Sequence, residues 1–263
     1  MALFENTLFG EIDRVAVAIA RLKTFEPAEG YYLAFSGGKD SIVIKKLAEM
    51  SGVKYESHFH LTTVDPPELI KFIRQYHKDV KTDHPTFSMR QLIIEKGIPP
   101  TRQHRYCCAF LKEGRQSKQG DADRFVITGV RAGESYKRAG RRMVETCLKK
   151  KTRKYLNVII DWSESDVWEF IEKYKLPYCK LYDEGFKRIG CIGCPLSNNQ
   201  KMELDRYPHI KKMYLTAFDL MLKKRDERGI RRERNFTDAE SVFKWFVGRG
   251  SKTGNPDQTV LFE

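Results

Sequence analysis

A six-residue string constrains the fold of this 263-residue chain more than any other feature. The apolar run at 31–35 is typical of a buried strand, and it leads directly into Ser36-Gly37-Gly38-Lys39-Asp40-Ser41. Residues 42–50 then carry apolar side chains at helical spacing. A strand, a glycine turn and a helix in this order predict an anion site. Glycines let the backbone approach the ligand, and the helix points its first N–H groups and its positive dipole end toward it.

The string differs from two common glycine loops. It has neither the spacing of a Walker A loop nor the pattern of a dinucleotide fingerprint. The alternative is an ordinary glycine-rich turn between a strand and a helix. Ser36, Lys39 and Ser41 favour a phosphate site over that alternative, because hydroxyl and ammonium groups donate hydrogen bonds to phosphate oxygens.

Strands and helices alternate over the first two thirds of the chain. We expect further strands at 55–63, 125–130 and 156–160, and helices at 67–76, 89–96 and 163–174, with residues 1–26 mostly helical. This alternation predicts an α/β fold with a Rossmann-like, mainly parallel sheet. Charged, helical segments dominate from 200 to 228. We therefore expect a nucleotide-binding domain at 1–180 and a helical, cysteine-bearing C-terminal region at 181–263.

The charge of the chain points to acidic partners. Its 48 Lys+Arg against 35 Asp+Glu give a net charge of 48 − 35 = +13, with basic segments at 137–154 and 223–234. These segments predict contact with a nucleic-acid backbone or another acidic acceptor, and four aromatic residues offer stacking surface after the second: Phe236, Phe243, Trp245 and Phe246. The alternative is solvated helix faces with the aromatic residues in a core.

Neither a membrane span nor a secretory signal is expected. No stretch approaches the roughly 18 apolar residues of a membrane helix, and charged residues interrupt residues 1–22. We expect a cytoplasmic location.

The six cysteines at 107, 108, 147, 179, 191 and 194 are then thiols, metal ligands or reactive groups instead of a disulfide framework. Cys191 and Cys194 have a spacing that lets both sulfurs face one metal; a zinc site and a redox dithiol remain alternatives. Cys179 is expected to be a small buried hydrophobic residue.

Several motifs carry a family resemblance. The string 36–41 resembles the SGGxDS pyrophosphate loop of the N-type ATP pyrophosphatases. The segments 58–73, 129–138 (GVRAGESYKR) and 161–178 (DW, DVW and LPY) resemble the phosphoadenosine phosphosulfate reductase branch, and they occur in that family's order. The resemblance covers about residues 30–196.

The resemblance implies a nucleotide site. It would bind ATP, or an adenylylated sulfate, and Mg²⁺ if ATP is cleaved. The implied phosphate-binding residues are Ser36, Gly37, Gly38, Lys39, Asp40, Ser41, Thr62, Arg131 and Arg138, and the candidate catalytic residues are Lys39, Asp40 and Arg131. A solvated basic surface is the alternative for the two arginines.

The resemblance also implies an iron–sulfur cluster. Residues 105–112 are similar to the RxCC…LK segment of adenylylsulfate reductases, and Cys191 to Pro195 is similar to the cluster end of the same branch. The implied [4Fe–4S] ligands are Cys108, Cys147, Cys191 and Cys194, with Cys107 as the alternative to Cys147.

The chain departs from the reductases in one respect. Their nucleophilic cysteine lies in a short C-terminal tail, whereas no cysteine follows Cys194 here. This favours the thiolation enzymes of the superfamily, in which ATP adenylylates an acceptor and sulfur then displaces AMP. We therefore expect as partners a nucleotide, a nucleic acid or other acidic acceptor, and a sulfur-donor protein of the cysteine desulfurase kind. Two alternatives are a phosphoadenosine phosphosulfate or adenylylsulfate reductase and a non-catalytic nucleotide- and nucleic-acid-binding module.

Overall fold

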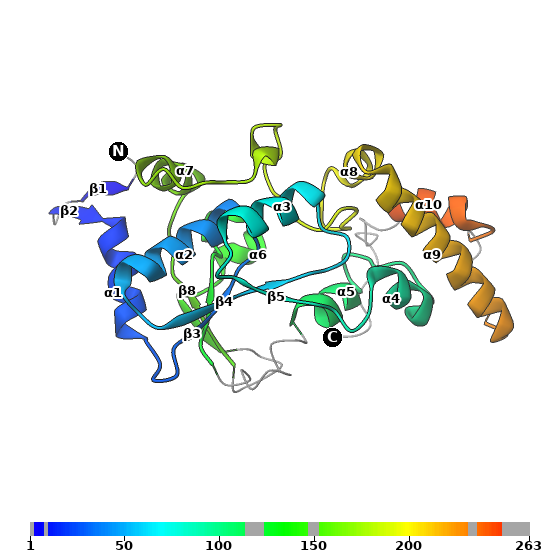
Figure 1. The fold of residues 1–263 in the computed structure, drawn as a ribbon, viewed down its shortest axis with the longest axis horizontal. Helices are drawn as coiled ribbons and strands as arrows, with labels where there is room; N and C mark the ends of the chain where they lie inside the picture. The colour runs from blue at the N-terminus through cyan, green and yellow to red at the C-terminus, as the bar shows by residue number, and fades with distance from the viewer. Residues whose placement is uncertain (1–2, 8–9, 114–123, 147–152, 231–235, 249–263) are drawn as a thin grey trace. The chain divides into compact units, whose positions relative to one another are not determined.

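The computed structural model describes residues 3–7, 10–113, 124–146, 153–230 and 236–248 (Figure 1). The chain divides into two compact units. The first unit comprises Met1–His60, Pro67–Asp83 and Gln116–Ile189, and the second comprises Leu61–Pro66, His84–Arg115 and Gly190–Glu263. The units are thus interleaved along the chain, and the expected division into domains at residue 180 stays a prediction.

A six-stranded sheet forms the centre of the first unit. Its strand order is β5-β4-β3-β6-β8-β7, with β3 at Tyr31–Ala34, β4 at Tyr55–His60, β5 at Lys81–Asp83, β6 at Val126–Thr128, β7 at Val144–Thr146 and β8 at Lys154–Asn157. All neighbours are parallel except β7, which is antiparallel to β8. The expected Rossmann-like, mainly parallel α/β fold is confirmed.

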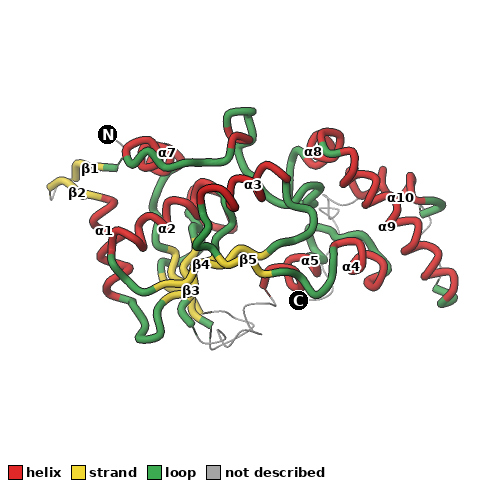
Figure 2. The backbone as a smooth tube through the Cα atoms, in the orientation of Figure 1, coloured by secondary structure: helices red, strands yellow, loops and turns green. Residues whose placement is uncertain are grey.

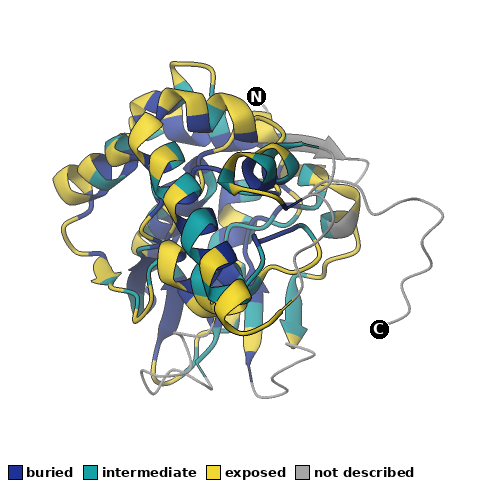
Figure 3. Cartoon of the chain, turned by 90° about the vertical axis from the view of Figure 1, so that its right-hand side faces the viewer, coloured by how far each residue is buried: buried dark blue, intermediate teal, exposed yellow. Residues whose placement is uncertain are grey.

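Helices pack on the sheet of the first unit. Helix α2 (Lys39–Ser51) follows β3 and packs against α1 (Arg14–Thr24) and α7 (Glu164–Lys173), while α3 (Pro67–Tyr76) follows β4. Figure 2 shows these red helices beside the yellow strands. The strand β3 is apolar and buried, whereas β4 carries polar residues where it pairs with β3 and buries Phe59 where it pairs with β5. Figure 3 shows the buried strands in dark blue.

Local signals set the ends of these helices. Ser163 caps α7, and its hydroxyl accepts a hydrogen bond from the Asp166 backbone N–H, as its position before the helix predicts. At the other end of α2, Gly52 takes a left-handed conformation at φ +74°, which glycine adopts without steric cost.

Four details of the sequence prediction are wrong. The described residues before Arg14 are not helical: β1 (Phe4–Thr7) pairs with β2 (Gly10–Asp13) in antiparallel register before α1, and Asp13 caps that helix. The short strands β5 and β7 were not expected, because each has three residues and no apolar run. Strand β8 begins two residues earlier than expected and ends at Asn157.

The second unit is helical in the residues that the structure describes. Its elements are α4 (Met89–Lys96), α5 (Tyr106–Cys108), the π-helical turn η1 (Ala109–Glu113), α8 (Gln200–Arg206), α9 (Pro208–Glu227) and α10 (Ala239–Val247). Phe236, Phe243 and Phe246 are buried in its core, with Trp245 packed against it. The interpretation of these aromatic residues as part of a core is therefore confirmed, and the other interpretation, a stacking surface, is wrong for the buried rings.

Among the helices that the structure describes, none is both long enough and apolar enough to cross a membrane. Residues 147–152 and 231–234 of the two basic segments lie outside the described residues, and the contact of these segments with nucleic acid stays a prediction.

Candidate functional site

The phosphate loop lies where the direction of the sheet connections reverses. From β3 the chain proceeds to β4 and β5 on one side, and β6 and β8 lie on the other. Ligands of open α/β sheets bind at such a switch point, beyond the carboxyl ends of the strands. The loop 36–41 follows β3, and Arg131 follows β6, so both meet at this edge.

Glycine is required at the apex of the loop. Gly37 has φ +72°, and a Cβ there would lie 2.7 Å from Leu69 Cδ1 and 2.9 Å from Ile73 Cδ1. These distances are shorter than any side chain tolerates. Gly38 is the N-cap of α2 and forms no side-chain cap, so the start of this helix faces the loop with backbone groups alone.

Hydroxyl groups complete the loop. The Gly38 N–H donates to Ser36 Oγ at 3.3 Å, and Ser41 Oγ donates to the Gly38 carbonyl at 2.8 Å. The Lys39 N–H donates to the Tyr182 hydroxyl at 2.9 Å. Burial raises the pKa of Tyr182, so its hydroxyl stays protonated at neutral pH. Tyr182 lies in the turn η3 (Lys180–Tyr182) and was not predicted.

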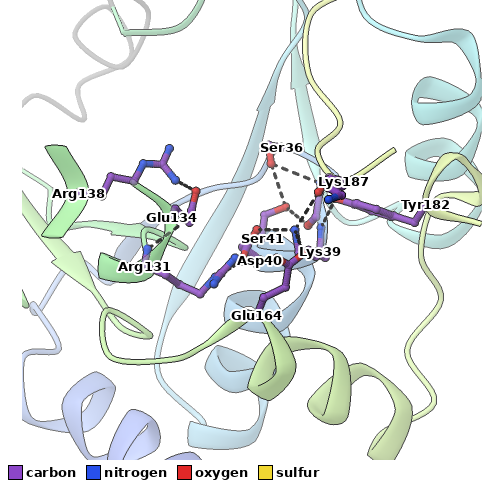
Figure 4. A network of polar contacts seen from close by, with 11 residues as sticks. Ser36, Lys39, Asp40, Ser41, Arg131, Glu134, Arg138, Glu164, Tyr182 and Lys187 are labelled. Atoms are coloured by element: carbon purple, nitrogen blue, oxygen red, sulfur yellow. Dashed lines mark hydrogen bonds and ion pairs between the residues drawn. The ribbon is translucent and has the colours of Figure 1, made fainter. Parts of the chain in front are cut away.

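The Lys39 ammonium is buried among oxygen atoms. Its Nζ donates to the Lys187 carbonyl at 3.1 Å and lies 3.5 Å from a Glu164 carboxylate oxygen and 3.9 Å from Asp40 (Figure 4). Only 6% of the side chain is exposed, so its charge acts in a region of low dielectric constant. Glu164 comes from the first turn of α7 and Lys187 from the segment after η3, and neither partner was predicted.

Arg131 follows β6, the strand next to β3, and binds the loop. Its Nε donates to Asp40 Oδ1 at 2.6 Å, and only 5% of the arginine side chain is exposed. Gly129 permits this approach, because a Cβ at that position would lie 3.0 Å from the Asp40 backbone. The alternative of a solvated surface is therefore wrong for Arg131, which is buried in an ion pair.

Arg138 lies on α6 (Tyr136–Ala139), after the turn η2 (Ala132–Glu134), and forms an ion pair with Glu134 (Figure 4). Glu134 also accepts a hydrogen bond from the Arg131 backbone N–H at 3.2 Å. Burial and the neighbouring charge of Arg188 lower the pKa of Arg138. The structure thus places all the predicted phosphate-binding residues except Thr62 in the first unit.

Thr62 belongs to the second unit, beside the cysteines. Its hydroxyl accepts a hydrogen bond from the Cys191 thiol at 3.4 Å. The Ile192 N–H donates to the Val64 carbonyl at 2.8 Å, which ties the segment 61–66 to the CxxC segment. The structure therefore links Thr62 to a cysteine, and its predicted contact with phosphate stays a prediction.

Four thiols interact within the second unit. The hydrogen bond with Cys108 and burial raise the pKa of Cys107, to which the charges of Cys108, Cys191 and Cys194 add. The Lys112 side chain lies close to the Cys191 sulfur, and this interaction raises the pKa of Lys112. This half-buried lysine places positive charge beside sulfur atoms, so the region suits thiolate ligands.

A metal site is not preformed in the residues that the structure describes: none of their His, Cys, Asp and Glu side chains form a group of three placed to hold a metal ion. Cys147, one of the four predicted ligands, lies outside the described residues. Cys179 lies in the first unit and is buried, as expected for a small core residue.

Two known proteins show the sequence similarity of this chain to its relatives. An uncharacterized protein of Methanocaldococcus jannaschii is 31% identical over 69% of this chain and 38% of its own length. The adenosine 5'-phosphosulfate reductase of Shouchella clausii is 25% identical over 69% of this chain and 78% of its own length. The chain spans less than half the length of the two Methanocaldococcus proteins it matches.

Solved structures share the fold. The phosphoadenylyl-sulfate reductase of Candida auris, in a phosphate complex, has a TM-score of 0.53 at 17% identity over 66% of this chain and 87% of its own. An FMN adenylyltransferase of Candida glabrata, in complex with FAD and pyrophosphate, has a TM-score of 0.52 at 14% identity over 73% of this chain and 72% of its own. At such identities the likeness concerns the fold alone.

A family model supplies the stronger link. The phosphoadenosine phosphosulfate reductase domain matches residues 30–197, which include the phosphate loop, Arg131, Arg138 and both cysteine pairs. This match covers more than half of the chain, and the protein therefore belongs to the phosphoadenosine phosphosulfate reductase family of the PP-loop superfamily.

Proposed function

We propose that this protein is an ATP pyrophosphatase that adenylylates an acceptor for sulfur transfer. The observation that carries the proposal is the loop 36–41 at the start of α2, with the buried Lys39 ammonium beside it. Backbone N–H groups and a buried positive charge stabilise the negative charge that develops on a leaving pyrophosphate.

The proposed reaction uses residues of the first unit. An acceptor oxygen attacks the α-phosphorus of ATP, the bond to the bridging oxygen breaks, and pyrophosphate leaves with the electron pair. The loop N–H groups, Ser36 and Ser41 bind the pyrophosphate, and Lys39 neutralises its charge. Arg131 holds Asp40 in place, and Arg138 binds a second anionic group. A sulfur nucleophile then attacks the activated carbon, and AMP leaves with the acceptor oxygen.

Mg²⁺ would enter this site with the nucleotide. In such sites it keeps several waters and is held by phosphate oxygens and one or two carboxylates. Asp40 is the carboxylate of the loop itself and lies in the first turn of α2.

The cysteine region suits an iron–sulfur cluster by the chemistry of its donors. Cys107, Cys108, Cys191 and Cys194 are four soft sulfur donors whose charges influence one another, and Lys112 offsets negative charge there. We propose Cys108, Cys147, Cys191 and Cys194 as the ligands, with Cys107 as the alternative to Cys147. A bound cluster would supply electron or sulfur transfer.

A second candidate function is reduction of adenylylsulfate or phosphoadenylylsulfate. The match to adenosine 5'-phosphosulfate reductases favours it, including 34% identity to the Allochromatium vinosum enzyme over 36% of this chain. The same loop would then bind the phosphosulfate of the nucleotide.

One experiment separates these functions. Anaerobically purified protein is tested for ATP–pyrophosphate exchange with acceptors added singly, and for sulfite release from each sulfonucleotide with a thiol. Lys39→Met should lower exchange by about a hundredfold or more. Lys46→Met is the matched control, because that lysine lies on the same helix but pairs with Glu49 at the surface.

The outcomes are distinct. Exchange that depends on an acceptor and on Lys39 supports the proposal. Sulfite release without exchange supports the reductase. Nucleotide binding with neither reaction supports a binding module, and loss of exchange in both lysine variants contradicts the role of Lys39.

A further inference from the structure

Tyr136 is almost entirely exposed. It begins α6, and 96% of its surface is accessible, the largest fraction among the exposed large hydrophobic residues described. A single exposed ring is ordinary on a protein surface, so the meaning of Tyr136 depends on the groups around it.

Several arginines lie close to this tyrosine in the sequence. Arg138 follows on the same helix, and Arg141 and Arg142 follow directly after it. Arg188 belongs to the segment after η3 and directly follows Lys187, whose carbonyl accepts a hydrogen bond from Lys39 Nζ of the phosphate loop at 3.1 Å. Like charges so close together lower the stability of the protein unless an anion accompanies them.

The carboxylates of this region do not neutralise it. Asp40 pairs with Arg131, Glu134 with Arg138, and Glu145 with Arg141. Within the described part of the chain, Arg142 and Arg188 form no ion pair, and both are exposed. Two guanidinium groups therefore remain available to phosphate, for which their planar donor set is well suited.

This surface connects directly to the phosphate loop. The chain runs from Arg131, which binds Asp40 of the loop, through Glu134 to Arg138, and Glu134 contacts both arginines. Figure 4 shows Arg138 and Glu134 on one side of the Arg131–Asp40 pair. A polymer held here would lie next to the residues proposed to bind pyrophosphate.

We propose that Tyr136, Arg138, Arg142 and Arg188 form a binding surface for single-stranded nucleic acid. One base stacks on Tyr136, and the arginines bind the flanking phosphates. Because the faces of a paired base are already stacked, the ring selects an unpaired strand. The inference rests on the proposed function and names its acceptor class: a nucleic acid, of which an oxygen next to the loop is adenylylated.

Nucleic acid explains this surface better than a protein partner does. A protein interface would combine the tyrosine with other apolar side chains, whereas its neighbours in sequence here, apart from Ala139 and Gly140, are mainly charged. Alternating phosphates and bases match alternating guanidinium and aromatic groups.

Binding is measured by fluorescence anisotropy with labelled RNA and DNA strands of about 12 nucleotides and the corresponding duplexes. Tyr136→Ala should weaken single-strand binding about fivefold or more. Tyr76→Ala is its matched control, a tyrosine of the same unit that is 52% exposed. Arg142→Gln with Arg188→Gln should lower the salt dependence by a log–log slope of about 1.4. Lys71→Gln with Arg74→Gln on α3 is the matched charge control.

Each outcome decides the inference. Preferential weakening by Tyr136→Ala, with Tyr76→Ala near wild type, supports it, and comparison of the two strands identifies RNA or DNA. Equal binding of duplexes, or equal losses in Tyr136→Ala and Tyr76→Ala, overturns it. The binding assay omits ATP, so a protein that binds strands without ATP–pyrophosphate exchange contradicts the proposed function but not this surface.

Discussion

The phosphate loop and the CxxC segment use the same backbone device in opposite surroundings. Gly37 and Gly193 both have φ +72°, and a Cβ on either would approach a neighbouring side chain to 3.0 Å or less. Both glycines face apolar side chains, Leu69 and Ile73 at Gly37 and Leu204 and Tyr214 at Gly193. The rest of the loop around Gly37 carries hydroxyls, a lysine and two ion pairs, whereas Gly193 lies against the apolar core of the second unit. A tight turn thus fixes the chain in both regions, and the surroundings decide whether charge or packing carries the stability.

The largest effect should come from the ion pair behind the loop. Asp40→Ala leaves the Arg131 guanidinium buried without its carboxylate, which costs about 3 kcal/mol of unfolding free energy. Urea unfolding measures this loss. Glu49→Ala, which removes an acid from the exposed end of the same helix, should cost about 1 kcal/mol or less. Equal losses in the two variants would show that the buried pair adds nothing special to the first unit.

The two turns can be compared directly by alanine substitution. Gly37→Ala combines a left-handed backbone with a 2.7 Å contact and should cost about 2 to 4 kcal/mol. Gly193→Ala meets its neighbours at 3.0 Å and should cost less. Gly52→Ala, with φ +74° and nothing within 4 Å, isolates the backbone cost of about 1 to 2 kcal/mol. If the packing around either turn relaxes freely, the losses of unfolding free energy will not decrease in the order Gly37, Gly193, Gly52.

Acid should weaken the first unit through His77. Burial lowers the pKa of His77 to about 4, where it packs between Phe35 and Phe72. Because the unfolded chain takes up this proton first, stability is full above about pH 6.5 and falls by about 2 to 3 kcal/mol as pH decreases to about 4.

Unfolding of wild type and His77→Asn across this range tests the prediction. The substitution removes the titrating group, so its stability should vary less with pH. Hydrogen exchange resolved by segment shows whether the loss is confined to the first unit. An equal pH dependence in both proteins would exclude His77 as the cause.

The smallest effects concern two similar capping boxes. Ser163 caps α7 in the first unit and Ser88 caps α4 in the second. Each Ser→Ala substitution should cost about 1 kcal/mol. A single unfolding transition that shifts equally in both variants shows that the units unfold together, whereas two transitions that shift separately show that they do not.

Contiguous features of the fold could be predicted from the sequence. The loop 36–41 was predictable because strand, turn and helix follow one another, and the bounds of α3 and α4 follow from apolar periodicity and nearby caps. The partners of Lys39 could not be predicted, since Tyr182 lies 143 positions from it. The grouping of Cys107 and Cys108 with Cys191 likewise depends on packing of distant segments, and the buried role of Phe246 depends on a core that no local pattern reveals.

The interleaving of the two units has a consequence for synthesis. The last segment of the first unit ends at Ile189, whereas the second unit needs residues from 190 onward. The sheet can therefore assemble while the C-terminal quarter is still being made, because domains form as their chain emerges. Residues 61–66 and 84–115 must wait for their partners during that interval, with Leu92 and Ile93 unprotected. We expect proteolysis of stalled nascent chains to cut there until α9 has emerged.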